Sequence, residues 1–316
     1  MKSNVIPPSA FRPRAGAADW MRQFQDWLCH RLETADGGGS RFRHEEWTHP
    51  GGGGGLARAL QHGAVLEKGS VIFSEVWDEM SEPLVKQLQL NDRSYFATGI
   101  TAGLHPRSPM VPISHLSLRY FEARTGEAWF AGSLDLTPVY VDVAQARWFH
   151  AQIQAVCNRH DAGYYARFKA EADEHFYLPH RGETRGVGGL HFPQLRVGPD
   201  GLFEELLAFV QDVGEVYGRT YCTLMGQNAH LAYSEPEKRW QQVRRARCAE
   251  FTLATGHPGR FEPATGYPEG MVLGLPPRAE WHYNHAPTPG SPEAQTQQWL
   301  RRGVDWLAPN NPAVGP

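Results

Sequence analysis

Cysteine is scarce in this chain of 316 residues, and its four copies stand far apart. Cys29, Cys157, Cys222 and Cys248 form no C-x-x-C pair, which excludes a zinc knuckle or a redox dithiol and favours reduced thiols. The chain also lacks any run of about 18 apolar residues, and its first residues contain no apolar segment of a secretory signal. These absences predict a cytoplasmic protein with no membrane span.

Charge is limited in both signs. Only 21% of the residues are charged and the net charge is -3, which is too little positive charge for a nucleic-acid footprint, so we expect a small-molecule or protein partner. No G-x-S-x-G, Walker loop or G-x-G-x-x-G after a strand is present, so the hydrolase, nucleoside-triphosphate and dinucleotide classes lack support. The length allows one large or two small domains. Without repeats or a clear boundary we expect one domain over residues 1–316, with 1–18 as a flexible N-terminal segment.

Hydrophobic periodicity predicts helices and strands in groups. Helical spacing, together with capping residues at Ser234 with Glu237 and at Ser291 with Pro292, predicts helices at 18–33, 142–160, 162–176, 200–221, 234–247 and 291–307. Residues rich in β-branched and aromatic types predict two strands around Gly69 within 63–77, and further strands at 114–123, 127–136, 249–255, 270–275 and 280–285. Because strands and helices do not strictly alternate, we expect an α+β fold with an antiparallel sheet.

Five consecutive glycines, Gly51–Gly55, interrupt the N-terminal part of the chain. They are consistent with a flexible linker or with a backbone that approaches a ligand closely. On composition alone the linker is favoured.

The strand at 114–123 alternates between two kinds of side chain. Its period of two places Leu116, Leu118 and Tyr120 on one face, and His115, Ser117, Arg119 and Phe121 on the other. The second face is either half exposed to water or lines a polar pocket.

A second histidine precedes this strand. His105 is followed by Pro106, Pro109 and Pro112, which restrict its loop and fix its position relative to His115. A preorganised pair of imidazoles suits proton transfer or metal binding. His150 is a further candidate, with a core or capped histidine as the alternative.

The stretch "LPHRGETRGVGG" combines His180 with Arg181, Arg185 and four glycines. Exposed backbone N–H groups and guanidinium groups in such a loop can face an anion. A solvated surface turn is the alternative.

Seven pieces of the sequence occur in an order that is recognisable: "GGGGGLARAL", "GAVLEKGSVIFSEV", "HPRSPMVPISHLSLRYF", "WFAGSLDLTPVY", "FYLPHRGETRGVGGLHF", "RRARCAEF" and "SPEAQ". In this order they resemble the oxygen-dependent coproporphyrinogen III oxidase family over nearly the whole chain. The resemblance implies a large antiparallel sheet flanked by helices on both faces, a homodimer, and conversion of two propionates of a tetrapyrrole to vinyl groups. It also implies dioxygen as the co-substrate and no organic cofactor.

The resemblance also implies roles for individual residues. His105, His115, His150 and His180 match four histidines assigned to a divalent metal ion or to proton transfer, with His115 as the proton donor. Substrate contacts are implied for Thr101, Ser117, Arg119 and the pair Gly266 and Tyr267, and we predict that Arg119 and Arg185 hold a carboxylate. His115, His105 and Arg119 are the predicted catalytic residues.

Three features of the family pattern are replaced. Pro193 and Gln194 replace an Asp-Asp pair, Tyr267 replaces an arginine, and Ser117 replaces an asparagine. Three functions therefore stay open. The first is a coproporphyrinogen III oxidase in which His191 or Arg185 supplies the missing contacts. The second is a divergent oxygen-using enzyme, with or without a bound metal ion, for a smaller or differently charged carboxylate, and the third is a tetrapyrrole-binding protein without catalysis. The retained histidines favour the two enzymes.

Overall fold

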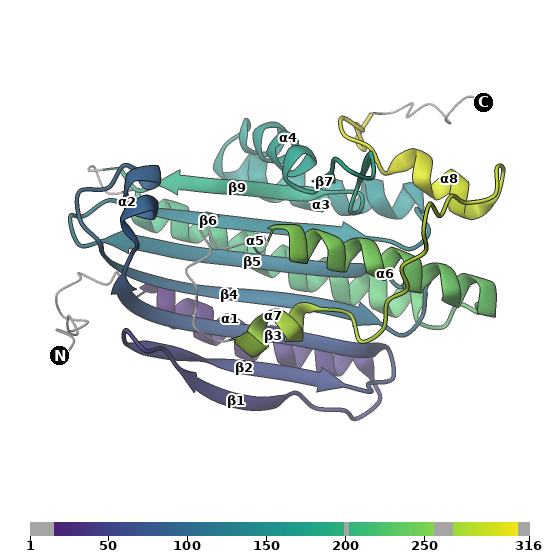
Figure 1. Cartoon of the computed structure of the whole chain (residues 1–316), viewed down its shortest axis with the longest axis horizontal. Coiled ribbons are helices and arrows are strands. Elements are labelled where there is room, and N and C mark those ends of the chain that lie inside the picture. Colours follow the sequence, from purple (N-terminus) through teal and green to yellow (C-terminus); the bar gives the residue numbers. More distant parts are fainter. Residues whose placement is uncertain (1–15, 199–201, 256–267, 309–316) are drawn as a thin grey trace.

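The computed structural model describes residues 16–198, 202–255 and 268–308 (Figure 1). Its helices are α1 (Gly16–Asp36), α2 (Glu82–Leu88), α3 (Val143–His160), α4 (Tyr164–His175), α5 (Phe203–Asn228), α6 (Glu235–Thr255), α7 (Pro268–Gly274) and α8 (Pro292–Trp299). Its strands are β1 (Arg43–Thr48), β2 (Gly53–Gln61), β3 (Leu66–Glu79), β4 (Ser94–Pro106), β5 (Ile113–Ala123), β6 (Ala128–Thr137), β7 (Tyr177–Leu178), β8 (Glu183–Thr184) and β9 (Gly189–Arg196).

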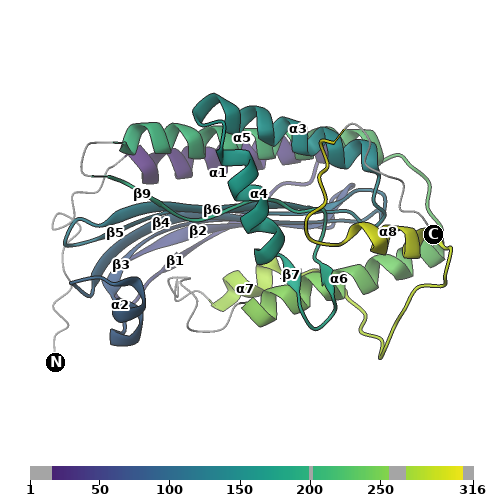
Figure 2. The ribbon, with the colours of Figure 1, turned by 90° about the horizontal axis from the view of Figure 1, so that it is seen from above.

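A seven-stranded sheet in the order β1-β2-β3-β4-β5-β6-β9 forms the centre of the molecule, and every neighbouring pair is antiparallel. Helices α1, α3 and α5 cover one face, while α6 and α7 lie on the other (Figure 2). The predicted fold, an antiparallel sheet flanked by helices on both faces, is confirmed. No helix in the described part of the chain is long and apolar enough to cross a membrane. All four cysteines are free thiols.

The face beneath α1, α3 and α5 carries the main hydrophobic core. Leu116, Leu118 and Tyr120 of β5 are all buried there, as the alternation of this strand predicts. On the opposite face His115, Ser117 and Arg119 are only half-buried. The sheet therefore has a packed apolar face and a second face, here called the site face, which is polar and partly open around these residues and carries a smaller apolar cluster beside α2.

The glycine run is not a linker, and this prediction is wrong. Gly53, Gly54 and Gly55 lie in β2 and pair with β1 and β3. A Cβ atom on Gly55 would lie 2.1 Å from the carbonyl oxygen of Phe73, and one on Gly54 would lie 2.1 Å from that of Trp47. Because only glycine fits between these neighbouring strands, composition here reflects close packing and not flexibility.

Two helices, α6 and α8, begin where the capping residues predict. At α8, Ser291 accepts a hydrogen bond from the N–H of Ala294 and Pro292 occupies the first turn. At α6, the Glu237 carboxylate accepts a hydrogen bond from the N–H of Ser234. Helix α1 begins at Gly16, so the last three residues of the segment predicted as flexible are helical and the others lie outside the described residues.

Several predicted strands are wrong. The segment 63–77 contains a single strand, β3, which begins at Leu66 and continues through Gly69. Residues 249–255 complete α6, residues 270–274 lie in α7, and 280–285 adopt no regular structure. Phe251 near the end of α6 is buried against Ala172, Phe176 and Leu178, and this packing overrides its local preference for a strand.

Candidate active site

A row of small and polar side chains crosses the site face. In the register of the sheet, Thr101 of β4 lies opposite Ser117 of β5, Ser117 opposite Ser133 of β6, and Ser133 opposite His191 of β9. All four residues are half-buried. Arg119, two residues further along β5, is also half-buried on this face. The structure thus brings together three of the residues predicted to contact substrate.

The histidines at the two ends of the proline-rich segment meet on the same face. His105 and His115 contact each other edge to face, with ring centroids 5.7 Å apart. His105 lies in strand β4 and not in a loop, which corrects one detail of the prediction. Antiparallel pairing of β4 with β5, in which Gly103 lies opposite His115, brings the two rings together.

A buried ion pair lies behind His115. Nδ1 of His115 is 3.2 Å from Oδ1 of Asp135, which lies directly opposite on β6. The Arg185 guanidinium contacts both oxygens of the same carboxylate, at 2.7 Å and 3.1 Å. Thr137 donates a third hydrogen bond to it. Asp135 and Arg185 are only 1% and 5% exposed at their side chains, so this carboxylate is fully committed to groups of the protein.

These contacts set the charges of the cluster. Burial lowers the pKa of His115, Arg185 lowers it further, and Asp135 opposes both. Burial and the neighbouring His115 hold the pKa of His105 well below its ordinary value. Burial alone would raise the pKa of Asp135, but Arg185 and His115 outweigh it and hold that pKa well below its usual range. Near neutral pH both imidazoles are therefore uncharged and Asp135 is ionised.

The hydrogen bonds also fix which ring nitrogen carries the proton. Nε2–H of His105 donates to the carbonyl of Gly274 at the end of α7, so its Nδ1 holds a lone pair. That Nδ1 is buried and has no hydrogen-bond partner among the described residues. In His115, Nδ1–H donates to Asp135, so Nε2 holds the lone pair. Each histidine thus keeps one basic nitrogen.

Helix α7 closes one end of the site face. Lys68 of β3 donates to the carbonyls of Val272 and Leu275, as His105 does to that of Gly274. A Cβ atom on Gly103 would lie only 3.4 Å from Gly274. The last turn of α7 is therefore fixed over the strand that carries Thr101 and His105.

The structure does not bring the other two predicted metal ligands, His150 and His180, to this pair. His150 of α3 donates from Nε2 to the carbonyl of Val187 and accepts at Nδ1 from the Tyr165 hydroxyl. His180 is half-exposed and pairs with Glu250. Among the described residues no group of three or more His, Cys, Asp or Glu side chains could hold a metal ion. Two imidazoles are fewer ligands than a resident divalent metal ordinarily takes from protein.

The arginines of the glycine-rich loop are engaged by carboxylates of the chain itself. Arg181 makes two hydrogen bonds to Glu250, and Arg185 binds Asp135. The Arg185 guanidinium also contacts the rings of Phe176 and Phe251. Its guanidinium therefore supports the cluster from behind, on contacts that sequence alone does not show.

Two of the departures from the family pattern lie on an edge strand. Pro193 and Gln194 are exposed, and the pairing of β9 with β6 shifts beside them. A proline without an N–H group suits such a bulge at the edge of a sheet. Gly266 and Tyr267 lie outside the described residues.

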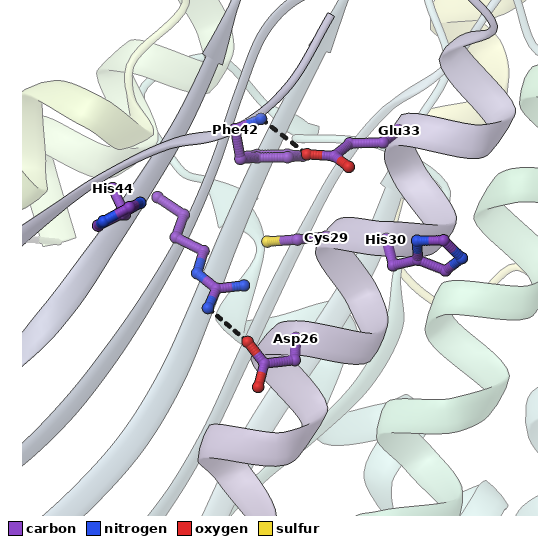
Figure 3. A pocket seen from close by; sticks show the side chains of 7 residues that line it. Asp26, Cys29, His30, Glu33, Phe42 and His44 are labelled. Carbon is purple, nitrogen blue, oxygen red and sulfur yellow. Dashed lines mark hydrogen bonds and ion pairs between the residues drawn. The ribbon is translucent and has the colours of Figure 1, made fainter. Parts of the chain in front are cut away.

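A separate hollow of about 310 Å³ lies on the other face of the sheet, between α1 and β2 (Figure 3). Its Arg58 pairs with Asp26, and burial raises the pKa of the Cys29 thiol to about 12, so this thiol is not a ready nucleophile. None of the predicted site residues lines this hollow.

Asp135 is the site residue that the sequence interpretation missed. The sequence does contain the information that locates Asp135, because β5 and β6 are joined by a short turn around Thr125 and Gly126. Counting equal numbers of residues back from this turn places His115 opposite Asp135. The strands were both predicted, and their register would have identified the pair.

One comparison with known proteins bears on this arrangement. A family model described as Coproporphyrinogen III oxidase matches residues 17–306. The match covers every strand of the sheet and all the site residues described above.

Proposed function

The chain belongs to the coproporphyrinogen III oxidase family, and on that premise we propose that it oxidatively decarboxylates coproporphyrinogen III. Each turnover converts one propionic acid side chain to a vinyl group. A carbon–carbon bond to the carboxyl group and a carbon–hydrogen bond break, carbon dioxide leaves, and two hydrogens pass to dioxygen to give hydrogen peroxide. Two turnovers give the divinyl product.

The observation that carries the proposal is the contact between His105, His115 and Asp135 on the half-open site face. A neutral His115 whose Nδ1–H is held by Asp135 presents a basic Nε2. We assign to this nitrogen the movement of a proton at the substrate, and to Asp135 the positioning of the ring. The Nδ1 atom of His105, whose ring contacts that of His115, is a second basic nitrogen.

Arg119 is proposed to hold a propionate carboxylate, with Thr101 and Ser117 as hydrogen-bonding neighbours. All three lie on adjacent strands of the site face. Arg185 was also predicted to hold a carboxylate of the substrate. Because Asp135 engages its guanidinium, we instead assign Arg185 the role of keeping Asp135 ionised.

The replacement of the family's Asp-Asp pair by Pro193 and Gln194 supports a second candidate, an oxygen-using oxidase of the same fold for a smaller carboxylate. No step in either proposal uses a metal ion, because the described residues do not provide a fitting ligand set. We also propose that the protein forms a homodimer. Light scattering of the purified protein tests it.

The direct test is to mix freshly reduced coproporphyrinogen III with the purified protein in aerated buffer and to follow the product masses. Two successive losses of carbon dioxide plus two hydrogens are expected, and neither is expected under nitrogen. If folded protein gives no product beside an active family member, the proposed substrate is wrong and the second candidate takes precedence.

A further inference from the structure

A pair of histidines outside the catalytic cluster stacks at the β9 edge of the site face. The rings of His175 and His191 lie nearly parallel, at 7°, with centroids 3.8 Å apart. His175 is the last residue of α4, which crosses the edge of the sheet (Figure 2). Phe251 of α6 contacts the His175 ring edge to face. The His191 ring is thus held in one plane from a neighbouring element.

The position of His191 connects it to the candidate active site. It lies opposite Ser133 and so forms the end of the row that runs through Ser117 to Thr101. Two strands and two residue positions separate it from Arg119. With strands ~4.8 Å apart and a rise of ~3.4 Å per residue, the two Cα positions are about 12 Å apart.

The stacked pair is suited to a carboxylate. Two imidazolium ions at this separation would repel each other strongly, so at most one ring of the pair carries a charge. A carboxylate beside His191 would stabilise that single charge and accept a hydrogen bond from it. Ser133 provides a hydroxyl group on the neighbouring strand.

We propose that His191 determines specificity by holding a second carboxylate of the substrate, about 12 Å from the one at Arg119. The inference deepens the proposed function and rests on it. Two carboxylate sites this far apart select a wide substrate with several carboxylates, and they disfavour a small monocarboxylate.

Binding of oxidised coproporphyrin III, a tetracarboxylate that cannot turn over, tests the proposal without depending on catalysis. Isothermal titration compares the unaltered protein with His191→Phe, which keeps a flat ring against His175, and with His191→Gln, which keeps a hydrogen-bond donor. His282→Phe is the matched control, because His282 likewise contacts a second histidine ring, that of His285, but pairs with Glu280 and lies outside the strands of the site face.

The expected result is about a tenfold weaker Kd for His191→Phe, a Kd within about threefold of the unaltered protein for His191→Gln, and no change for the control. A role in packing alone predicts the reverse, with the phenylalanine tolerated and the glutamine not. Any pattern in which His191→Phe binds as well as His191→Gln overturns the proposal. If the unaltered protein binds no porphyrin tetracarboxylate, the proposed function fails, and this inference fails with it.

Discussion

Asp135 accepts a hydrogen bond from Nδ1 of His115 while both of its oxygens are held by Arg185. The carboxylate therefore orients the imidazole, and the guanidinium keeps the carboxylate charged. The imidazole alone faces the half-open side of the sheet, since its side chain is 17% exposed and that of Asp135 only 1%. Five predictions follow from this cluster and from the sheet that holds it.

Replacing His115 is expected to remove the proton transfer. His115→Ala should lower kcat on the true substrate by about 10²–10⁴, with a smaller change in KM. His180→Ala is the control, because His180 pairs with Glu250 away from the cluster. Unchanged turnover in His115→Ala would show that this role is wrong.

Removing the charge of Asp135 should damage both rate and stability. Asp135→Asn leaves the buried Arg185 without its counter-ion, at a cost of about 3–5 kcal/mol in the free energy of unfolding. The double variant Asp135→Asn/Arg185→Met should regain most of this stability but not the activity. Urea unfolding and steady-state kinetics separate the two effects. Recovery of full activity in the double variant would contradict the positioning role.

Acid should destabilise the fold well before carboxylates titrate. Burial lowers the pKa of His150 from 6.5 to about 3, and the pKa values of His105 and His115 are lowered as well. The unfolded chain therefore binds more protons than the folded one below pH 6.5, so stability is full above this pH and is lost as pH falls. Each such group contributes up to about 1.4 kcal/mol per pH unit. Urea unfolding between pH 7.5 and 4.5 measures the slope, and His150→Gln should flatten it.

The glycines of β2 are expected to resist substitution. Gly55→Ala would place Cβ 2.1 Å from the carbonyl oxygen of Phe73, and we expect a loss of about 1–3 kcal/mol. Gly226→Ala, at an exposed position in the last turn of α5 with nothing within 4 Å, should instead gain up to about 0.5–1 kcal/mol. Thermal unfolding compares the two. A neutral Gly55→Ala would restore the linker interpretation.

Chelation should leave the enzyme active. The described residues bring two imidazoles together and no third ligand, so protein purified without a His tag and treated with a chelator is expected to keep its turnover. Metal analysis of the same sample gives the stoichiometry. A bound metal near one per chain, with activity lost in the chelator and restored by that metal, would contradict the prediction.

The sequence predicted best those helices and strands whose limits and buried faces depend on residues close together in the chain. The alternation of β5 identified its buried face, and the capping residues at Ser234 and Ser291 located two helix starts. Strand β4 was not predicted. Nearly all of its side chains are buried on both faces, so its sequence shows no alternation of polar and apolar residues. Residues 249–255 at the end of α6 were wrongly predicted as a strand, because their composition is typical of strands.

In the candidate site, too, some residues could be identified from local sequence, whereas others depend on contacts between distant parts of the chain. His105 and His115 could be paired because prolines lie between them, whereas Asp135 required the register of a hairpin. Arg185 required a contact across fifty positions of the chain. His150 and His180 share a residue type with the pair, but their hydrogen bonds to Val187 and Glu250 belong to other parts of the fold. Residue type alone cannot distinguish these cases.

Strands β1 to β6 lie in the sheet in the order in which they occur in the chain. During synthesis on a ribosome, each new strand therefore finds its partner already made, and the pairing of His115 with Asp135 is complete once β6 has emerged. The counter-ion of Asp135 is Arg185, which is synthesised fifty residues later. The order of synthesis thus allows His115 to pair with Asp135 before Arg185 can bury the pair.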